Sequence, residues 1–336
     1  MNSNVIPEHY RLSIKVDIDQ ERFEGTVEIN VKLMETIRYV ILHAAKSLNI
    51  TESKVFNSDT ELSIKQTFAY EPYEFWVIEM KESINVEDEK PLNIRLNFSF
   101  KSKLGTDMTG FYLSKYNDNG NVIKLAATQF QDTHARQAFP CFDEPSFKST
   151  FQLTIEHHDN FTAISNTNSK SIETISNETT TSSWKRTEFE ETPKMVTYLL
   201  AFIISDFKCN HDQTQSLNGT EINVDICSSP PEINNTAYSL TKVSDIISNF
   251  QKRFDYSYQL DKMHLVALPD FSAGAMENWG LLTFRETALL WNELISSAAD
   301  KMRVASVVAH EIAHMVFVFV FFYSFKSLID YYFFSL

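Results

Sequence analysis

The residues with the clearest chemical potential are His310, Glu311 and His314, which form a His-Glu-x-x-His pattern. On a helix, positions i and i+4 share one face, so both histidines can turn an imidazole nitrogen toward one metal ion. Zinc suits such ligands, and a catalytic zinc site keeps one position open for water. Glu311 is close enough to accept a proton from that water. Because the pattern fixes only three positions, two histidines that share a helix face by chance are the alternative.

Two helices and one strand must position this pattern. Helical spacing predicts a first helix, whose apolar face is formed by Leu240, Val243, Ile246, Ile247, Phe250 and Phe254. A short buried strand is predicted at residues 265–268 and stops at Pro269. Ser297 and Asp300 fit the start of a capping box, which opens the helix that carries His310.

The first two hundred residues are typical of β structure. Alternation of apolar and polar residues predicts strands with one solvated face at residues 10–18, 27–33, 92–100 and 151–155. A continuous apolar run at residues 198–204 predicts a buried strand, and the polar segment 165–183 a surface hairpin or loop. Strands at such short intervals indicate an antiparallel sandwich or a curved, saddle-like sheet. The change to helical spacing after Asp206 places a domain boundary near Phe207.

Composition excludes some classes of protein. A length of 336 residues, 43% of them hydrophobic, suggests two domains with large cores. The net charge of −14 argues against nucleic acid and against anionic lipid as partners. Three widely spaced cysteines are no disulfide scaffold, although one bridge, such as Cys209 to Cys227, can form. Cys141 lies in an apolar stretch and is predicted to be a small buried hydrophobic residue.

A second motif, Gly-Ala-Met-Glu-Asn at residues 274–278, stands between the short strand and the His-Glu helix. Together the two motifs resemble the gluzincin aminopeptidases, the group that includes aminopeptidase N and the puromycin-sensitive enzyme. The likeness continues in other stretches, at residues 128–130, 135–136, 138–145, 147–148, 279–281 and 284–290. It covers about residues 5 to 314. The resemblance implies an N-terminal β domain at residues 1–206 and the first part of an α+β, thermolysin-like catalytic domain at residues 207–314.

The same resemblance implies a role for each residue of the second motif. Glu277 would pair with the free α-amino group of a peptide substrate. Gly274 and Ala275 would offer backbone groups to the substrate, and glycine permits that close approach. Met276 would line the side-chain pocket, with ordinary core packing as the alternative.

Three further residues receive roles in the same way. His310 and His314 would hold one Zn²⁺ ion, with Glu311 as the general base. Gln129, from the N-terminal domain, would contribute to the pocket for the amine or first residue, unless it only satisfies strand backbone groups. A neutral amide there disfavours the branch of the family that is specific for acidic residues.

The resemblance ends after His314. The family supplies a glutamate as third zinc ligand, and this position falls on Phe333, which cannot bind zinc. Asp330 is the nearest carboxylate that could substitute. Residues 315–336 form a divergent apolar tail, which we interpret as a truncation or a misread exon end. Two histidines alone make a poorly defined zinc site, so we expect this chain to be inactive as it stands.

Two functions from different classes follow. The first is a zinc metallo-aminopeptidase that hydrolyses N-terminal residues from peptides, with a broad neutral or basic preference. The alternative is a catalytically dead protein that binds peptides or partner proteins and lacks the third zinc ligand.

The opening residues, Met1-Asn2-Ser3-Asn4, show no signal peptide, which predicts a cytoplasmic protein. A membrane-anchored ectodomain or an extracellular protein is the alternative if the true N-terminus is missing. Glycosylation sequons at Asn49, Asn160 and Asn218 are expected by chance in a chain rich in Asn, Ser and Thr. The apolar run at residues 315–323 is too short to span a membrane. The sequence does not indicate an oligomeric state.

Overall fold

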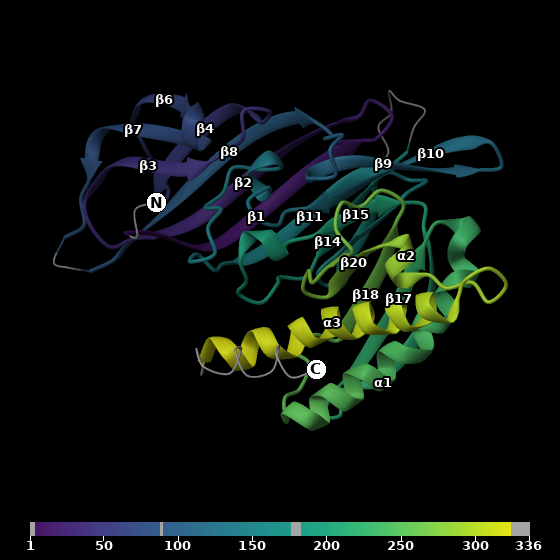
Figure 1. The fold of residues 1–336 in the computed structure, drawn as a ribbon. Coiled ribbons are helices and arrows are strands. Elements are labelled where there is room, and N and C mark those ends of the chain that lie inside the picture. Colours follow the sequence, from purple (N-terminus) through teal and green to yellow (C-terminus); the bar gives the residue numbers. More distant parts are fainter. Residues whose placement is uncertain (1–3, 88–89, 176–182, 324–336) are drawn as a thin grey trace. The chain divides into compact units, whose positions relative to one another are not determined.

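The computed structural model describes residues 4–87, 90–175 and 183–323, with backbone alone over residues 316–323. Contacts divide the chain into two compact units, Met1–Asp206 and Phe207–Leu336. The first unit consists mostly of strands, and the second combines a sheet with helices (Figure 1). The predicted fold class, a β domain followed by an α+β unit, is confirmed.

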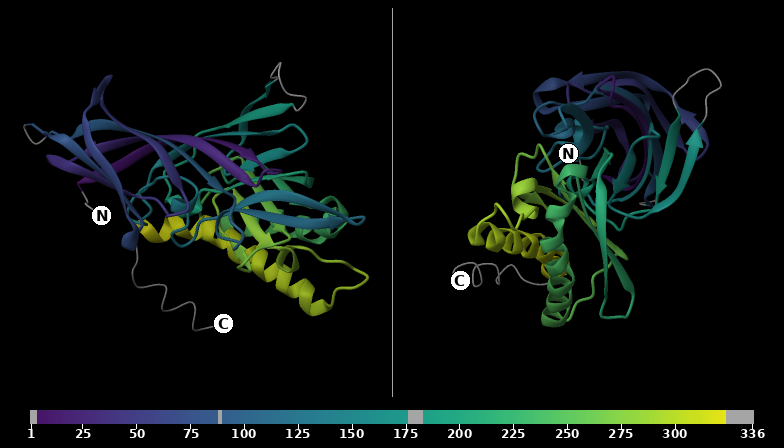
Figure 2. Two further views of the ribbon diagram at one scale, coloured as in Figure 1. Left: turned by 90° about the horizontal axis from the view of Figure 1, so that it is seen from above. Right: turned by 90° about the vertical axis from the view of Figure 1, so that its right-hand side faces the viewer.

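The N-terminal unit contains three sheets. The largest has the strand order β13-β14-β11-β1-β2-β8-β4-β5, the second β12-β15-β10-β9, and the third β3-β7-β6. The strands are β1 (Val5–Asp17), β2 (Arg22–Leu33), β3 (Ile37–His43), β4 (Asn49–Asn57), β5 (Thr60–Leu62), β6 (Ile64–Tyr70), β7 (Phe75–Ile84), β8 (Leu92–Lys103), β9 (Gly110–Asp118), β10 (Asn121–Gln129), β11 (Thr150–His158), β12 (Thr162–Ser165), β13 (Ser169–Ile175), β14 (Trp184–Phe189) and β15 (Phe202–Ser205). Figure 2 shows the large sheet strongly twisted and curved.

The sequence had suggested an antiparallel sheet. The large sheet departs from that prediction because it contains a parallel pair of strands. β1 pairs with β2 in antiparallel fashion but with β11 in parallel, with Tyr10 opposite Phe151. Tyr10 and Phe151 stack at 4.8 Å between ring centroids, so the parallel register also joins two core aromatic rings. Alternation specifies which face of a strand is buried, but it does not specify the direction of its neighbour.

The predicted strand over residues 198–204 is wrong in its first half. Thr197–Leu199 form a 3₁₀ helix, η3, and only Phe202–Ser205 pair as β15. Asn166 explains the difference because its side chain donates to the Leu199 carbonyl (2.8 Å) and accepts from the Ala201 amide (2.9 Å). These backbone groups are therefore satisfied by a side chain instead of a neighbouring strand.

A buried ion pair anchors the loops of the N-terminal unit. Arg136, in the 3₁₀ helix η2 (Ala135–Gln137), donates from Nε to Asp143 at 3.0 Å, and the Asp143 side chain is 1% exposed. The other carboxylate oxygen of Asp143 accepts from the Thr197 hydroxyl at 2.7 Å. Arg136 also contacts the half-exposed Glu74 at 3.2 Å, next to the 3₁₀ helix η1 (Glu71–Tyr73). The network thus joins three segments that are far apart in the sequence.

The C-terminal unit is built on one mixed sheet with the strand order β16-β17-β18-β20-β19. Its elements are β16 (Lys208–Gln215), β17 (Glu221–Ser228), η4 (Pro230–Thr236), α1 (Ala237–Phe254), β18 (Lys262–Leu268), β19 (Ala275–Met276), β20 (Leu281–Arg285), α2 (Glu286–Leu289) and α3 (Ala298–Tyr323). β17, β18 and β20 run parallel, and α1 connects the first two. α1 packs on β16 and β17, and α3 lies beside α1 (Figure 1).

The cysteines follow the sequence expectation. Cys209 and Cys227 form a disulfide between β16 and β17, and Cys141 is a buried free thiol. Burial raises the pKa of the Cys141 thiol well above its usual value, so the thiolate is disfavoured. Among the described helices, none has the length and apolar character needed to cross a membrane.

The buried Arg136–Asp143 ion pair should matter far more for stability than an exposed ion pair. Two substitutions that each remove one charge test this expectation. Asp143→Asn leaves the buried charge of Arg136 with only Glu74, so the free energy of unfolding should fall by about 3 kcal/mol. Lys46→Gln removes the exposed Lys46–Glu71 ion pair, whose side chains are 78% and 60% exposed, and should cost about 0–1 kcal/mol. Urea unfolding followed by circular dichroism measures both. Equal losses in the two variants would show that the network does not anchor the unit.

Candidate metal and peptide site

Helix α3 carries the His-Glu-x-x-His residues and begins as the sequence predicts. The Ser297 hydroxyl accepts from the Asp300 amide at 3.1 Å, and the Asp300 carboxylate accepts from the Ser297 amide at 2.8 Å. These reciprocal hydrogen bonds form the capping box. The buried stripe of the helix consists of Val304, Val308, Ile312 and Met315. This stripe fixes the rotation of α3 about its axis and therefore the direction in which the histidines point.

The two histidines of α3 converge on one point. His310 Nε2 and His314 Nε2 are 3.2 Å apart. Two nitrogen ligands at about 2.0–2.1 Å from one tetrahedral zinc stand about 3.3 Å from each other. The separation of the two nitrogens therefore matches that of two ligands of one zinc ion, which is consistent with the i, i+4 spacing.

Glu277 of the second motif lies beside this pair. Ligand atoms of Glu277, Glu311 and His314 all fall within 4.8 Å of one another. Two stretches that are far apart in the sequence thus bring two carboxylates and the His314 imidazole together. His310 is exposed and adjoins this cluster through its contact with His314. Glu311 is 5% exposed, and its Oε2 atom is buried without a hydrogen-bond partner in the described part of the chain. A buried carboxylate oxygen without a partner is costly, and a water or substrate group in the site would satisfy it.

The electrostatics of the site reflect this crowding of charge. Burial, and then the negative charge of Glu277, raise the pKa of Glu311 to about 8. Burial lowers the pKa of His314, an effect that the charge of Glu277 opposes and that of His310 reinforces. A cation held between the histidines would favour the ionised Glu311, because an opposite charge nearby stabilises a carboxylate.

The loop that carries Glu277 is held from both ends. Arg285, the last residue of β20, donates from its guanidinium to the carbonyls of Phe271 (3.2 Å) and Ser272 (2.8 Å). Its backbone amide donates to the Gly274 carbonyl at 3.0 Å. On the other side, the buried Asn278 side chain donates to the Thr283 hydroxyl at 3.1 Å.

Sequence reasoning had assigned no role to Arg285 or Asn278. The position of Arg285 at the end of an apolar run was the available signal, since the end of a strand is where a side chain can reach an adjacent loop. Together the two residues fix the path of the loop against β20, and so the position of Glu277.

The other members of the second motif differ in accessibility. Gly274 is exposed and Ala275 is half-buried, whereas Met276 is fully buried where β19 pairs with β20. Gly274 has no positive φ, and a Cβ atom there would meet no atom of the described residues within 4 Å, apart from its chain neighbours. The fold itself therefore does not require glycine at this position. Close approach of a ligand to the backbone would require glycine at this position.

Gln129 lies in the N-terminal unit, at the last position of β10 opposite Gly110. Its side chain is 5% exposed, and its Oε1 atom is buried without a hydrogen-bond partner in the described residues. The amide therefore does not satisfy neighbouring strand groups through this oxygen. The two positions considered for a third zinc ligand, Asp330 and Phe333, lie outside the described residues.

Two glycine variants separate a requirement of the fold from a requirement of the site. Gly274→Ala should change the free energy of unfolding by less than about 0.5 kcal/mol, because the methyl group enters open space. In β2, a Cβ at Gly25 would lie 2.4 Å from the Ser13 carbonyl oxygen and 2.8 Å from a ring carbon of Phe100. Gly25→Ala should therefore cost about 1–3 kcal/mol. Thermal unfolding of both variants provides the measurement, and a Gly274→Ala loss as large as that of Gly25→Ala would contradict the prediction.

Comparison with known proteins identifies the family of the chain. The chain matches the Peptidase M1 N-terminal domain over residues 6–199 and the Peptidase family M1 domain over residues 238–317. It is 38% identical over 316 residues to an aminopeptidase A of Gloydius brevicauda. It is 37% identical to a glutamyl aminopeptidase of Bitis rhinoceros and 35% identical to an aminopeptidase N of Rattus norvegicus.

These alignments cover 93% of this chain but only 32 or 33% of the relatives, so the chain spans about a third of their length. The family inferred from the two motifs is confirmed. The chain belongs to the peptidase M1 family of zinc aminopeptidases, of which it carries the N-terminal portion.

Proposed function

We propose that this site serves zinc-dependent removal of the N-terminal residue from peptides. The observation that carries the proposal is the proximity of Glu277 to Glu311 and His314. One motif supplies a carboxylate that can bind a free amino group, and the other supplies a metal site and a base. A protein that only bound zinc would not need the carboxylate for the amino group. A protein that only bound peptides would not need the metal site and the base.

The residues divide the reaction between them. Zinc, when bound by His310 and His314, would act as a Lewis acid toward the scissile carbonyl and would acidify a water molecule. Glu311 would accept the proton of that water and later deliver it to the leaving amine. Glu277 would bind the α-ammonium group and so restrict cleavage to the first peptide bond. Gly274 and Ala275 would hold the substrate backbone.

For the first residue of the substrate we propose a broad neutral or basic preference. Gln129 supports it through the family resemblance, in which the branch specific for acidic residues has an acidic residue at this position instead of a neutral amide. The names of the relatives differ on this point, since they include both glutamyl aminopeptidases and aminopeptidase N. Comparison of alanyl, leucyl, arginyl and glutamyl chromogenic amides therefore tests the assignment, and faster hydrolysis of the glutamyl amide would overturn it.

We further propose that the 336-residue chain does not turn over substrate as it stands. Its sequence has Phe333 where the family resemblance requires the third zinc ligand. Two histidine ligands bind zinc less firmly than three protein ligands, and they leave the ion poorly oriented.

The test measures zinc content and hydrolysis of alanyl and leucyl amides by the purified chain. We expect less than stoichiometric zinc after dialysis, a further loss in His314→Ala, and no turnover. In a longer product that supplies the third ligand, we expect turnover. There, Glu311→Gln should lower kcat by roughly 10²- to 10⁴-fold while zinc is retained, because only the base is removed.

Three outcomes would change the proposal. Stoichiometric zinc with turnover in the 336-residue chain would refute its inactivity and make Asp330 the first candidate for the missing ligand. Full activity of Glu311→Gln would refute the assignment of the base. Peptide binding that depends on Glu277, without turnover in either product, would favour the second candidate function, a peptide-binding protein.

A further inference from the structure

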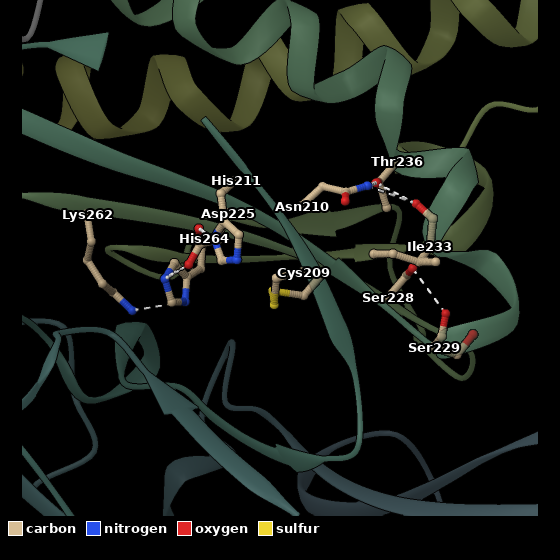
Figure 3. Close-up of a disulfide and its surroundings, with 11 residues drawn as sticks. Cys209, Asn210, His211, Asp225, Ser228, Ser229, Ile233, Thr236, Lys262 and His264 are labelled. Atoms are coloured by element: carbon tan, nitrogen blue, oxygen red, sulfur yellow. Dashed lines mark hydrogen bonds and ion pairs between the residues drawn. A yellow bond between two sulfur atoms is a disulfide. The ribbon is translucent and has the colours of Figure 1, made fainter. Parts of the chain in front are cut away.

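The hairpin formed by β16 and β17 is closed by a disulfide. Cys209 and Cys227 stand directly opposite each other, with their Cα atoms 4.1 Å apart (Figure 3). Asp225 of β17 accepts from His211 of β16 at 2.5 Å. Asp225 also contacts His264 of the next strand, β18, at 2.8 Å. Disulfides persist in secreted and lumenal proteins, whereas the cytosol keeps thiols reduced. The cross-link therefore indicates an oxidising compartment.

The tip of the same hairpin carries a glycosylation sequon, Asn218-Gly219-Thr220. All three residues are exposed. Hydrogen bonds hold the turn open to solvent, with the Ser216 amide donating to the Thr220 carbonyl at 2.8 Å and the Thr220 amide to the Ser216 hydroxyl at 2.9 Å. Gly219 has φ 82°, and a Cβ atom there would meet no atom of the described residues within 4 Å. The exposed tip is thus accessible for attachment of an oligosaccharide to Asn218.

A second sequon lies on an equally accessible turn in the N-terminal unit. Asn160 stands between β11 and β12, where the Phe161 amide donates to the His158 carbonyl at 3.1 Å. Both Asn160 and Thr162 are exposed, whereas Phe161 points into the core and is 9% exposed. The turn therefore presents the asparagine outward.

Another sequon, Asn97-Phe98-Ser99, provides an internal comparison. It lies in the middle of β8, which pairs on one side with β2 and on the other with β4. Asn97 is half-buried, and its side-chain oxygen is buried. An oligosaccharide on this amide would have to stand on a central strand that is paired on both sides, where the folded sheet gives it less access than an exposed turn. A sequon that occurs by chance need not be accessible, so the contrast with Asn218 and Asn160 distinguishes usable sites from unusable ones.

We propose that this chain matures in the secretory pathway, with a Cys209–Cys227 disulfide and N-linked oligosaccharides at Asn218 and Asn160. The disulfide and the oligosaccharides are independent modifications that are made in the same oxidising compartment, and two of them fall on one hairpin. The proposal replaces the cytoplasmic expectation with the extracellular or ectodomain alternative. It depends on no part of the proposed catalytic function.

The test uses the native protein isolated from its source cells. Thiols are alkylated in denaturant without reduction, the protein is digested, and N-glycans are removed with an amidase in ¹⁸O-water before mass spectrometry. We expect a Cys209–Cys227 cross-linked peptide, with Cys141 alkylated as the control thiol. We expect Asn218 and Asn160 as ¹⁸O-labelled aspartate, and Asn97 as unmodified asparagine.

Each part of the proposal can fail by itself. Alkylated Cys209 and Cys227 would overturn the assignment to an oxidising compartment. Unmodified Asn218 and Asn160 in a protein that contains the disulfide would overturn the modification sites. When the full chain is secreted from eukaryotic cells, Asn218→Gln should remove one oligosaccharide, visible as a single step in electrophoretic mobility. Asn97→Gln should leave the mobility unchanged, and the same step for both variants would contradict the accessibility argument.

Discussion

The rotation of α3 about its own axis is the constraint on which the candidate site depends. Val304, Val308, Ile312 and Met315 are each 4% exposed or less, so the helix cannot turn without uncovering them. With that stripe buried, His310 and His314 share one face and Glu311 turns inward. The hydrophobic effect, which has no direction of its own, thereby determines the direction of three polar side chains.

The molecule treats buried charge in two different ways. Arg136 and Asp143 are paired, and the remaining oxygen of Asp143 is hydrogen-bonded to Thr197, so this network can stabilise the N-terminal unit. Glu311 is nearly as buried, yet one of its oxygens has no partner among the described residues. The Arg136–Asp143 network is complete without a ligand, whereas Glu311 lacks a partner for one oxygen among the described residues. That difference distinguishes a structural ion pair from the candidate site, where the proposed metal, water or substrate group would supply the missing partner.

Hydrogen bonds from Arg285 and Asn278 hold the loop that contains Glu277. The side chain of Arg285 reaches two loop carbonyls and its amide a third, so the loop before Glu277 has little freedom to move. Asn278 fixes the loop directly after Glu277. In the proposed function Glu277 would select a free amino group, and such a carboxylate must be held within a fraction of an ångström, which this double attachment would achieve.

The sequence alone determined the features that depend on local spacing. The capping box at Ser297, the i, i+4 histidine pair and the apolar face of α1 all arise within a few residues, where helix geometry leaves one solution. Tertiary structure decided the rest. The parallel pairing of β1 with β11, the 3₁₀ helix at residues 197–199 and the place of Glu277 beside His314 each depend on a partner far along the chain. Periodicity shows which face of an element is buried but not which partner buries it, because packing between distant segments is settled only when the whole unit closes.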